Sequence, residues 1–455
     1  MTDETTFLSA ERNEQLAIMV CHLRDGGLPP ALADRGRTIL LDLLGVTVAG
    51  ARTSEMKALT SAWHTDAGRT IPLGSTNATT VESAAELDAI ASCCLELDEG
   101  NKYAAGHPAA HVVPAAIAAA RLSPAAVDGQ AFLAAVLAGY EVAARFGYAL
   151  TRDPRWHTHG HWGATGAAAA AASIRGADTN RVAAAIDASS ALVHVAPWAV
   201  VLDGNFARNL WMAGAVRAGL DASRLASAGL VHNSGAVAHT LGDIVGTLDL
   251  DRLTEGLGDR WLTLEGYAKQ HASCSYTHAA VDAVQSLRST ASWTADDVES
   301  VRVRTHSLAE PLFKRHPNTR LGAMFSLPFV VAAAFVSDAI DSGALDPDGR
   351  TFREAERFSA RVSVNSADEL DVLLPRRRAA EVTVVLRSGD VVSASTPNPV
   401  GDVDHFPMDY DAVHGKIARL IGSTDADRLA ALVDRLPATD DIAALLSTIP
   451  LRAKM

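Results

Sequence analysis

The sequence predicts a mainly α-helical protein, in which a large all-helical domain is joined to a smaller α+β domain. Three observations predict this fold class. Residues 10–265 carry Ala, Leu, Val and Gly at helical spacing, with Gly and Pro between the helical stretches. Near residue 295 the pattern changes to the alternation that is typical of strands. From Tyr410 onward helical spacing returns, so we expect the C-terminal helices to rejoin the first domain.

The first region contains clear helical faces. One such face is formed by Leu133, Val136, Leu137, Tyr140 and Ala144. The Ala-rich stretch Gly163–Ile174 allows close contact between helices and indicates buried helices in a large bundle. Another helix is expected to begin near Pro114, because proline suits the first helical turn.

The second region alternates apolar and polar residues over short stretches. Strands are predicted at Val298–Thr305 and Phe358–Val364, and a hairpin at Glu381–Arg387 and Val391–Ser395, with helices at Ala279–Ser289 and Phe325–Ser342. We therefore expect residues 1–266 and 400–455 to form the all-helical domain and residues 267–399 the α+β domain.

Composition and charge exclude several classes of partner. The 455 residues include 40 Lys and Arg against 53 Asp and Glu, which gives a net charge of −13. An acidic chain is a poor match for nucleic acid or for an anionic membrane surface, because both bind clustered Lys and Arg. The longest apolar runs, such as Phe325–Val336, are shorter than the roughly 18 residues that span a bilayer. We therefore expect neither nucleic acid nor a membrane as a partner.

The cysteines and the N-terminus bear on location. Cys21, Cys93, Cys94 and Cys274 have no CxxC spacing, which fits reduced, mostly buried thiols. The N-terminal residues are polar and acidic, unlike a secretory signal. A cytoplasmic location is expected. The motifs GxGxxG, GxxxxGK[ST], GxSxG and HExxH do not occur, so dinucleotide, P-loop, serine-hydrolase and zincin chemistry lose their usual support.

Two clusters in the helical region could carry chemistry. Residues 96–108 (ELDEGNKYAAGHP) place carboxylates, a lysine and a histidine before a helix, whose N-terminus favours an anionic ligand. The alternative is an exposed acidic loop. Residues 155–163 (RWHTHGHWG) contain three alternate histidines, which could bind a metal, act as acid or base in a cleft, or be structural.

Three further segments are candidates. Arg208 leads into an apolar helix and could bind a carboxylate or lie on a solvated face. Residues 267–278 (YAKQHASCSYTH) lie at the border between the helical region and the α+β region, and ligand sites are common at such domain borders. Within them, Cys274 could be a nucleophile or a buried structural thiol. The basic run Arg376–Arg378 is interpreted as a solvated loop, with substrate steering as the alternative.

In this order and spacing, the clusters resemble the MmgE/PrpD family, which includes 2-methylcitrate dehydratase, cis-aconitate decarboxylase and iminodisuccinate epimerase. The resemblance covers nearly the whole chain. It is carried by LLDLLGVTVAGA (40–51), ELDEGNKYAAGHPAAHVVPAAIAAA (96–120), GYEVAARFG (139–147), RWHTHGHWGATGAAAAAAS (155–173), KQHASCSYTHAAVDA (269–283), FSLPFVVAAAF (325–335), AAEVTVVLRSGD (379–390) and the Gly401-Asp402 segment.

The resemblance implies a large helical domain, a smaller α+β lid, C-terminal helices that return to the first domain, and a homodimer. It also implies small di- or tricarboxylate substrates and neither a metal nor an organic cofactor. The implied active site lies between the helical domain and the lid, at Glu96, Asp98, His107, His157 and Lys269. The chain differs from several lyase members at two positions: Arg208 and Trp211 stand where those members have Lys and His. Gly100 stands where a Thr can occur in the decarboxylase branch.

These chemistries share one demand, since a bond next to a carboxylate must break while negative charge develops on that carboxylate. The hypothesis assigns His107 and His157 as the acid/base pair. Lys269 would donate a proton or anchor a carboxylate, and Asp98 would orient a neighbouring side chain. The remaining candidates are expected to bind substrate or support binding: Glu96, Lys102, Arg208, His159 and Tyr276.

Three functions stay open at this point. The first is a lyase of the dehydratase or decarboxylase type that acts on a polycarboxylate. The second is an epimerase or isomerase of a dicarboxylate, which uses the same proton abstraction without a leaving group. The third is a non-catalytic relative that binds carboxylates. Trp211 favours the second and third, because it replaces a polar ring by an apolar one.

Overall fold

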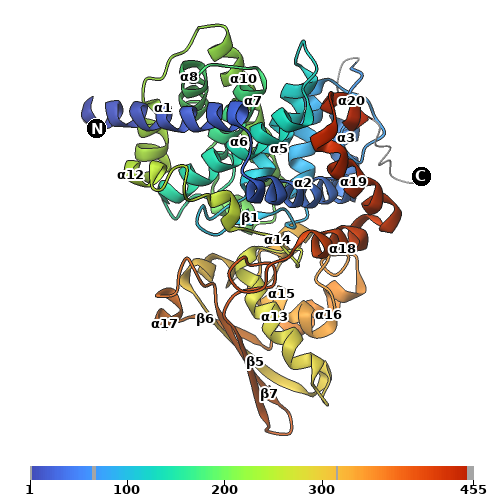
Figure 1. The fold of residues 1–455 in the computed structure, drawn as a ribbon. Coiled ribbons are helices and arrows are strands. Elements are labelled where there is room, and N and C mark those ends of the chain that lie inside the picture. Colours follow the sequence, from blue (N-terminus) through green and yellow to red (C-terminus); the bar gives the residue numbers. More distant parts are fainter. Residues whose placement is uncertain (1–2, 64–67, 314–315, 448–455) are drawn as a thin grey trace.

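The computed structural model describes residues 3–63, 68–313 and 316–447. Its described part is mainly helical, with a large helical body and a smaller α+β region beneath it (Figure 1). This confirms the predicted fold class. We call the part made of α1–α12 and α18–α20 the helical body, and the part made of α13–α17 and β5–β8 the lid. The exact domain limits stay a prediction, and residues 448–455 of the predicted C-terminal segment lie outside the described residues.

The helical body begins with twelve α-helices and short connecting elements. The α-helices are α1 (Asp3–Gly26), α2 (Pro30–Ala51), α3 (Ser54–Ala62), α4 (Val81–Cys93), α5 (Pro108–Arg121), α6 (Gly129–Ala149), α7 (Gly163–Ile174), α8 (Thr179–Ser190), α9 (Trp198–Leu202), α10 (Leu210–Ser227), α11 (Ala236–His239) and α12 (Leu250–Thr254). The other elements are η1 (Phe206–Asn209), η2 (Thr240–Val245), η3 (Leu262–Glu265), and the antiparallel pairs β1 (Gly100–Asn101) with β4 (Gly266–Tyr267) and β2 (Leu150–Arg152) with β3 (Gly246–Leu248).

The Ala-rich helix α7 lies at the centre of the body. It packs against α5, α6, α8 and α10, and its residues 163–173 are all buried. Helices α6 and α7 approach closely, since a Cβ on Gly139 would lie 2.6 Å from the carbonyl oxygen of Gly166. Small side chains therefore allow the tight contacts that the Ala-rich stretch predicts.

Helix α5 begins earlier than the sequence suggests. The expected start near Pro114 is wrong, because Pro108 occupies the first turn and His107 is the N-cap residue. Pro114 lies inside the helix, where it is buried. A proline there removes one helical hydrogen bond. Burial of the surrounding Val and Ala side chains offsets that loss. As a marker of the first helical turn, Pro108 is as good a candidate as Pro114, so the sequence does not separate the two.

The lid contains a four-stranded sheet in the order β6-β5-β7-β8. Strand β5 (Val298–Thr305) is parallel to β6 (Val362–Ser366) and antiparallel to β7 (Ala380–Leu386), which forms a hairpin with β8 (Val391–Thr396). The other elements are α13 (Ser275–Ser289), α14 (Arg320–Met324), α15 (Leu327–Val336), α16 (Arg350–Ser359), α17 (Asp368–Asp371), η4 (Ala295–Asp297) and η5 (Ser307–Phe313). Helix α13 packs on β7 and β8, and α15 packs between α13 and α16.

The predicted strand at β5 and the predicted hairpin are confirmed to within a residue at each end. The strand predicted at Phe358–Val364 is wrong in its first half, because Phe358 lies in the last turn of α16, which ends at Ser359, and β6 starts at Val362. Phe352, Ala355 and Phe358 form the buried face of that helix at near-helical spacing. The helix predicted at Phe325–Ser342 is shorter than expected and ends at Val336.

The C-terminal helices return to the helical body, as predicted. They are α18 (Tyr410–Ile421), α19 (Ser423–Arg435), the short η6 (Leu436–Ala438) and α20 (Ile442–Ser447). Helices α18 and α19 pack on α2, and α20 packs on α5. A buried ion pair joins Lys416 Nζ of α18 to Asp42 Oδ1 of α2 at 2.6 Å. The body is therefore completed by the last part of the chain.

The chain enters and leaves the lid at one place. The backbone N–H of Ala268 donates to the carbonyl oxygen of Gly401 at 3.3 Å. Gly401 has a φ of +96°, and a Cβ there would lie 1.9 Å from the Ala268 oxygen, so only glycine fits. The two segments that connect the body to the lid therefore lie side by side and are joined by a hydrogen bond.

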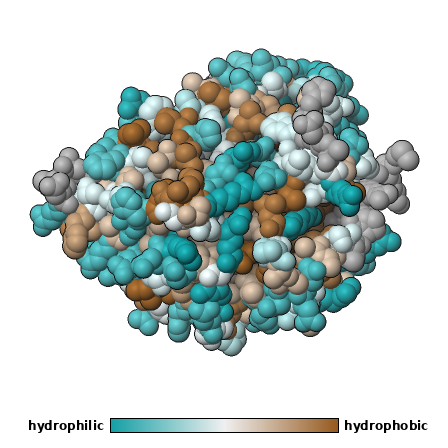
Figure 2. All heavy atoms as spheres, turned by 90° about the horizontal axis from the view of Figure 1, so that it is seen from above, coloured by the Kyte–Doolittle hydropathy of each residue, from teal (hydrophilic) through white to brown (hydrophobic). Residues whose placement is uncertain are grey.

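The outer face of the helical body is mixed in character. Seen from above, hydrophobic residues form several small groups between hydrophilic ones (Figure 2). Among the described residues, no helix is both long and apolar enough to cross a bilayer.

Candidate active site

A small cavity lies where the helical body meets the lid. Its free volume is about 30 Å³. The body contributes Glu96, Ala105, Gly106, His107, Arg152, His157, Thr158 and Trp198, and the remaining lining residues are Tyr267, Cys274, Ser275, Tyr276, Phe325 and Arg378. The sequence clusters 96–108, 155–163 and 267–278 therefore meet at one point.

The first cluster, residues 96–108, is held in place by hydrogen bonds to backbone groups. The side chain of Asn101 accepts from the backbone N–H groups of Tyr103 and Ala104, each at 3.0 Å, and donates to the Leu262 oxygen at 2.7 Å. Glu96 has a φ of +53°, which is uncommon for a residue other than glycine. Such strained backbone often accompanies functional sites. A Cβ on Gly106 would lie 2.4 Å from Thr158 Oγ1, so the first two clusters make contact at a glycine.

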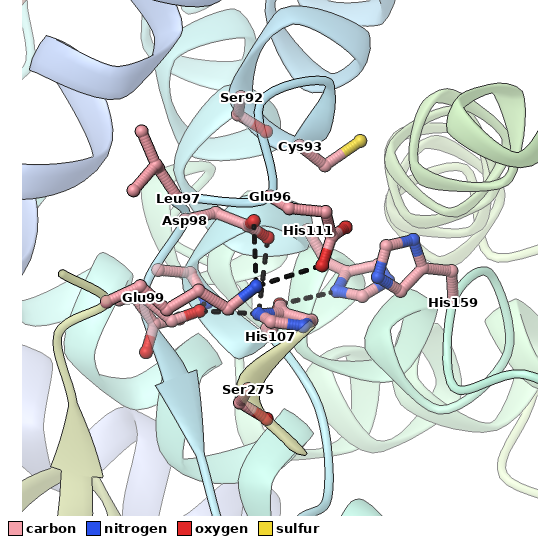
Figure 3. A network of polar contacts seen from close by, with 12 residues as sticks. Ser92, Cys93, Glu96, Leu97, Asp98, Glu99, His107, His111, His159 and Ser275 are labelled. Carbon is pink, nitrogen blue, oxygen red and sulfur yellow. Dashed lines mark hydrogen bonds and ion pairs between the residues drawn. The ribbon is translucent and has the colours of Figure 1, made fainter. Parts of the chain in front are cut away.

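His107 has a defined proton arrangement. Its Nδ1 lies 2.7 Å from the carbonyl oxygen of Glu99, which can only accept, so Nδ1 carries the proton and Nε2 is the acceptor. Asp98 Oδ2 lies 3.2 Å from the same Nδ1. Burial, together with the nearby charge of Lys269, holds the pKa of His107 well below 6.5. The imidazole is therefore neutral. Figure 3 shows Asp98, Glu99 and His107 converging, with His111 and His159 grouped to one side.

The carboxyl groups beside His107 have raised pKa values. Burial raises the pKa of Glu99 to about 8, against the opposing effect of hydrogen bonds from the Ala109 N–H at 2.7 Å and the Tyr140 hydroxyl at 2.9 Å. Glu99 is thus largely protonated at neutral pH. Burial also raises the pKa of Asp98 to about 6, and Lys269 acts in the opposite direction.

His157 has the complementary arrangement. Its Nδ1 accepts from the backbone N–H of His159 at 3.3 Å, which leaves the proton on Nε2. The ring packs edge-on against Trp198, with 4.7 Å between the ring centroids. Burial and the charge of Arg152 hold its pKa well below 6.5, so this imidazole is also neutral. One histidine therefore offers an acceptor nitrogen and the other a donor N–H.

A layer of ion pairs lies behind the cavity. Glu96 pairs with Arg208 and, at 3.0 Å, with Lys269, whose Nζ also lies 3.8 Å from Asp98. Arg208 further donates to His159 Nε2 at 3.3 Å. Arg208, Lys269 and His159 are completely buried and do not line the cavity. They contact residues that line it: Arg208 and Lys269 pair with Glu96, and His159 packs against His107 and His157.

The structure gives Lys102 a different position from the one expected. Its Nζ donates to Asp402 at 3.0 Å, to Asp404 at 2.6 Å and to the carbonyl oxygen of Arg376 at 3.0 Å. The ammonium is therefore fully occupied by protein groups and does not line the cavity. Of the nine residues predicted for the site, Glu96, His107, His157 and Tyr276 reach the cavity directly.

Two arginines that line the cavity were missed or misjudged from the sequence. Arg152 lies in β2 and was not singled out, although it is just ahead of the histidine cluster. Arg378 was interpreted as part of a solvated loop, which is wrong for this residue: its side chain is buried and reaches the cavity. The apolar residues Ala379 and Ala380, which lead into β7, were the signal that the basic run ends in a buried position.

The three alternate histidines do not converge on one point. His161 Nε2 bonds to the His157 carbonyl oxygen at 2.8 Å, while His157 faces the cavity and His159 faces Arg208. Within the described ranges, no group of three or more His, Cys, Asp and Glu side chains could hold a metal ion.

Comparison with known families identifies two domains in the chain. The MmgE/PrpD N-terminal domain matches residues 14–248, and the MmgE/PrpD C-terminal domain matches residues 271–436. A comparison with curated proteins gives no match. The two matches meet near the junction that forms the cavity, and together they cover most of the sequence. The chain belongs to the MmgE/PrpD family.

Proposed function

We propose that this protein is a cofactor-independent lyase that removes a proton next to a carboxylate of a small di- or tricarboxylate. Membership of the family supports a dehydratase-type or related function in general. The observation that carries the finer proposal is the pair of neutral imidazoles at one cavity, with an acceptor nitrogen on His107 and a donor N–H on His157. That pairing is what elimination needs.

In the proposed reaction, His107 Nε2 takes the proton from the carbon next to a carboxylate. The electron pair of that C–H bond moves toward the carboxylate and then forms the double bond as the leaving group departs. His157 Nε2–H supplies the proton that converts a leaving hydroxyl into water, which leaves an imidazolate beside the positive charge of Arg152 until a proton returns from solvent. Arg152 and Arg378 line the same cavity and would stabilise the negative charge that develops. Both histidines then return to their starting states by proton exchange with solvent.

The buried pairs have a supporting role in this proposal. Lys269 and Arg208 neutralise Glu96, so the cavity keeps a carboxylate without repelling an anionic substrate. Asp98 lies beside His107 Nδ1 and stabilises the imidazolium that forms when Nε2 takes a proton. A free volume of about 30 Å³ holds roughly two water molecules, so the cavity must widen to admit a polycarboxylate.

Epimerisation of a dicarboxylate is the second candidate, because the same observation fits it. A donor and an acceptor imidazole can remove a proton from one face and return one to the other. Trp211 packs near His157, with 6.2 Å between ring centroids, and adds no titratable group there. This favours chemistry without a leaving group.

Incubation with citrate-like acids in D2O separates the candidates. Dehydration gives an alkene absorbance, decarboxylation gives CO2, and epimerisation gives only deuterium at the α-carbon. Alkene or CO2 supports the lyase, and deuterium exchange alone supports the epimerase. No reaction, combined with stabilisation against heat by the same acids, would leave a carboxylate-binding protein and would contradict both enzymes.

The two histidines can be tested directly. We expect His107→Asn and His157→Asn each to lower kcat by about 100-fold or more, because positioned acid and base groups contribute this much. Circular dichroism and thermal melting check that both variants fold. His405→Asn is the matched control, since His405 is exposed and distant in sequence from both clusters. Wild-type kcat in both variants would remove the assignment.

A further inference from the structure

Arg378 is a buried arginine of the lid. Its side chain is nearly fully buried, with 4% of its surface exposed, and it lines the cavity. The guanidinium lies between the rings of Tyr267 and Tyr276, at 5.7 and 5.2 Å from their centroids. Both rings also line the cavity. The cation is therefore held in place on two sides.

The hydrogen bonds of Arg378 are incomplete. Nη2 donates to the Lys102 carbonyl oxygen at 2.9 Å, and Nη1 reaches Ser275 Oγ at 3.3 Å. Its Nε is buried and has no hydrogen-bond partner among the described residues. A buried N–H without an acceptor is costly, and an arginine fork matches a carboxylate in shape and charge. An anionic ligand in the cavity would supply the missing acceptor.

We infer that Arg378 binds a carboxylate of the substrate from the lid side of the cavity and that Lys102 is the residue that positions it. This inference rests on the proposed function, and it names a binding residue for that same site. It also reverses the roles expected from sequence, since Lys102 was expected to bind substrate and the basic run to lie in solvent.

The role of Lys102 follows from its partners. Its ammonium has three N–H groups, and these meet Asp402, Asp404 and the Arg376 carbonyl oxygen. It thereby fixes the segment two residues before Arg378, while its own carbonyl holds the guanidinium.

Asn398 completes this brace. Its Oδ1 accepts from the Arg378 backbone N–H at 2.8 Å, and its Nδ2 donates to the Arg376 oxygen at 3.1 Å and to Asp402 at 3.2 Å. The backbone on both sides of the basic run is thus tied to Lys102. Loss of these hydrogen bonds would leave Arg378 in place but with its guanidinium poorly oriented toward the cavity.

The test measures binding of tricarballylate, an unreactive tricarboxylate, by isothermal titration calorimetry, alongside kcat and KM for the acid that turns over. Arg378→Gln is expected to weaken tricarballylate binding by about 10- to 100-fold and to raise KM more than it lowers kcat. Arg377→Gln is the matched control, because Arg377 is adjacent and exposed, and it should bind like the wild type.

Lys102→Met tests positioning, and Asp404→Asn is a milder change, because the Asp404 side chain is 37% exposed. Either variant should weaken binding when Arg378 is present and add nothing further in combination with Arg378→Gln. If Lys102 and Asp404 had a purely structural role, the loss of binding in their variants would add to the loss caused by Arg378→Gln. Additive losses would therefore overturn the positioning role.

The outcomes separate this inference from the proposed function. Wild-type turnover with an unchanged KM in Arg378→Gln would overturn the inference and leave the function standing. Tricarballylate binding that is lost in Arg378→Gln, in a protein that turns over no polycarboxylate, would support the inference and contradict the function. A wild-type protein that neither binds nor turns over carboxylates would contradict both.

Discussion

At the scale of single residues, the site is built from groups whose protonation differs from that in water. His107 and His157 are neutral because they are buried, and Glu99 keeps its proton for the same reason. The sequence could indicate that these residue types gather. It could not indicate which nitrogen carries a proton, because that depends on the Glu99 carbonyl and the His159 N–H, and backbone groups are the same in every residue.

Glu99 gives a prediction about pH. Its pKa is raised to about 8 in the fold, above the value near 4.3 that is typical of an unfolded chain, so the native state binds the proton more tightly. The stability that this proton provides is lost as pH rises toward 8. Glu99→Gln mimics the protonated acid, so the stability of this variant should not decrease in this way as pH rises. We expect the Tm of this variant, relative to wild type, to rise between pH 5 and 8.5.

Thermal denaturation at several pH values measures this difference. Glu356→Gln, at an exposed position on α16, is the control and should follow the wild type across the range. A Glu99→Gln difference that stays constant with pH would show that Glu99 is ionised in the native state.

The same scale shows where sequence reasoning about the site stopped. Lys102 and Arg378 are both cations near motif residues. The sequence alone does not show which of the two is paired with carboxylates of the protein and which lines the cavity. The answer depends on Asp402 and Asp404, which lie some 300 positions beyond Lys102 in the chain. Long-range pairing of this kind leaves no local pattern.

At the scale of elements, periodicity predicts what is regular and fails at boundaries. Strands β5, β7 and β8 were found because a sheet with one buried face has a period of two. The end of α16 was misread because Phe358 is followed by alternating residues, and a buried aromatic residue fits either structure. The start of α5 was misplaced because two prolines compete for one role.

The contact between α2 and α18 gives a prediction at this scale. A Cβ on Gly45 of α2 would lie 2.6 Å from side-chain atoms of Ile417 in α18. Gly45→Ala should therefore lower the free energy of unfolding by about 1–3 kcal/mol through overpacking, despite the better helix propensity of alanine.

Gly415→Ala, in α18 itself, is the matched control. Its added Cβ would have no neighbour closer than 3.8 Å, so the propensity effect should act alone and stabilise by about 0.5–1 kcal/mol. Urea denaturation of both variants gives the two signs. Equal effects at the two glycines would contradict the close contact between α2 and α18.

At the scale of the whole molecule, burial of titratable groups makes stability depend on pH. Burial lowers the pKa of seven imidazoles in the described part of the chain: His107, His111, His157, His159, His161, His278 and His306. Against them stand four carboxyls with raised pKa values: Glu86, Asp88, Asp98 and Glu99. The histidines outnumber the acids, so their effect should dominate below neutral pH.

The sign follows from proton binding. As pH falls through about 6.5, the histidines of the unfolded chain take up protons that the native state does not bind, so the unfolded state gains stability. We expect the free energy of unfolding to decrease between pH 7 and 5, as measured by urea denaturation. His306→Gln removes one imidazole, whose native pKa is lowered to about 3, and should reduce the slope. A stability that is constant or increases over this range would contradict the prediction.

The return of the C-terminal helices has a consequence for how the protein is made. The lid elements from α13 to β8 are contiguous in the sequence, whereas the helical body needs α18 and α19 to cover one face of α2. During synthesis, the lid segment leaves the ribosome before these helices do. The side of α2 around Gly45, which receives Ile417, therefore stays uncovered until α18 has been synthesised. Until then, this apolar side of α2 is a surface through which a nascent chain can aggregate.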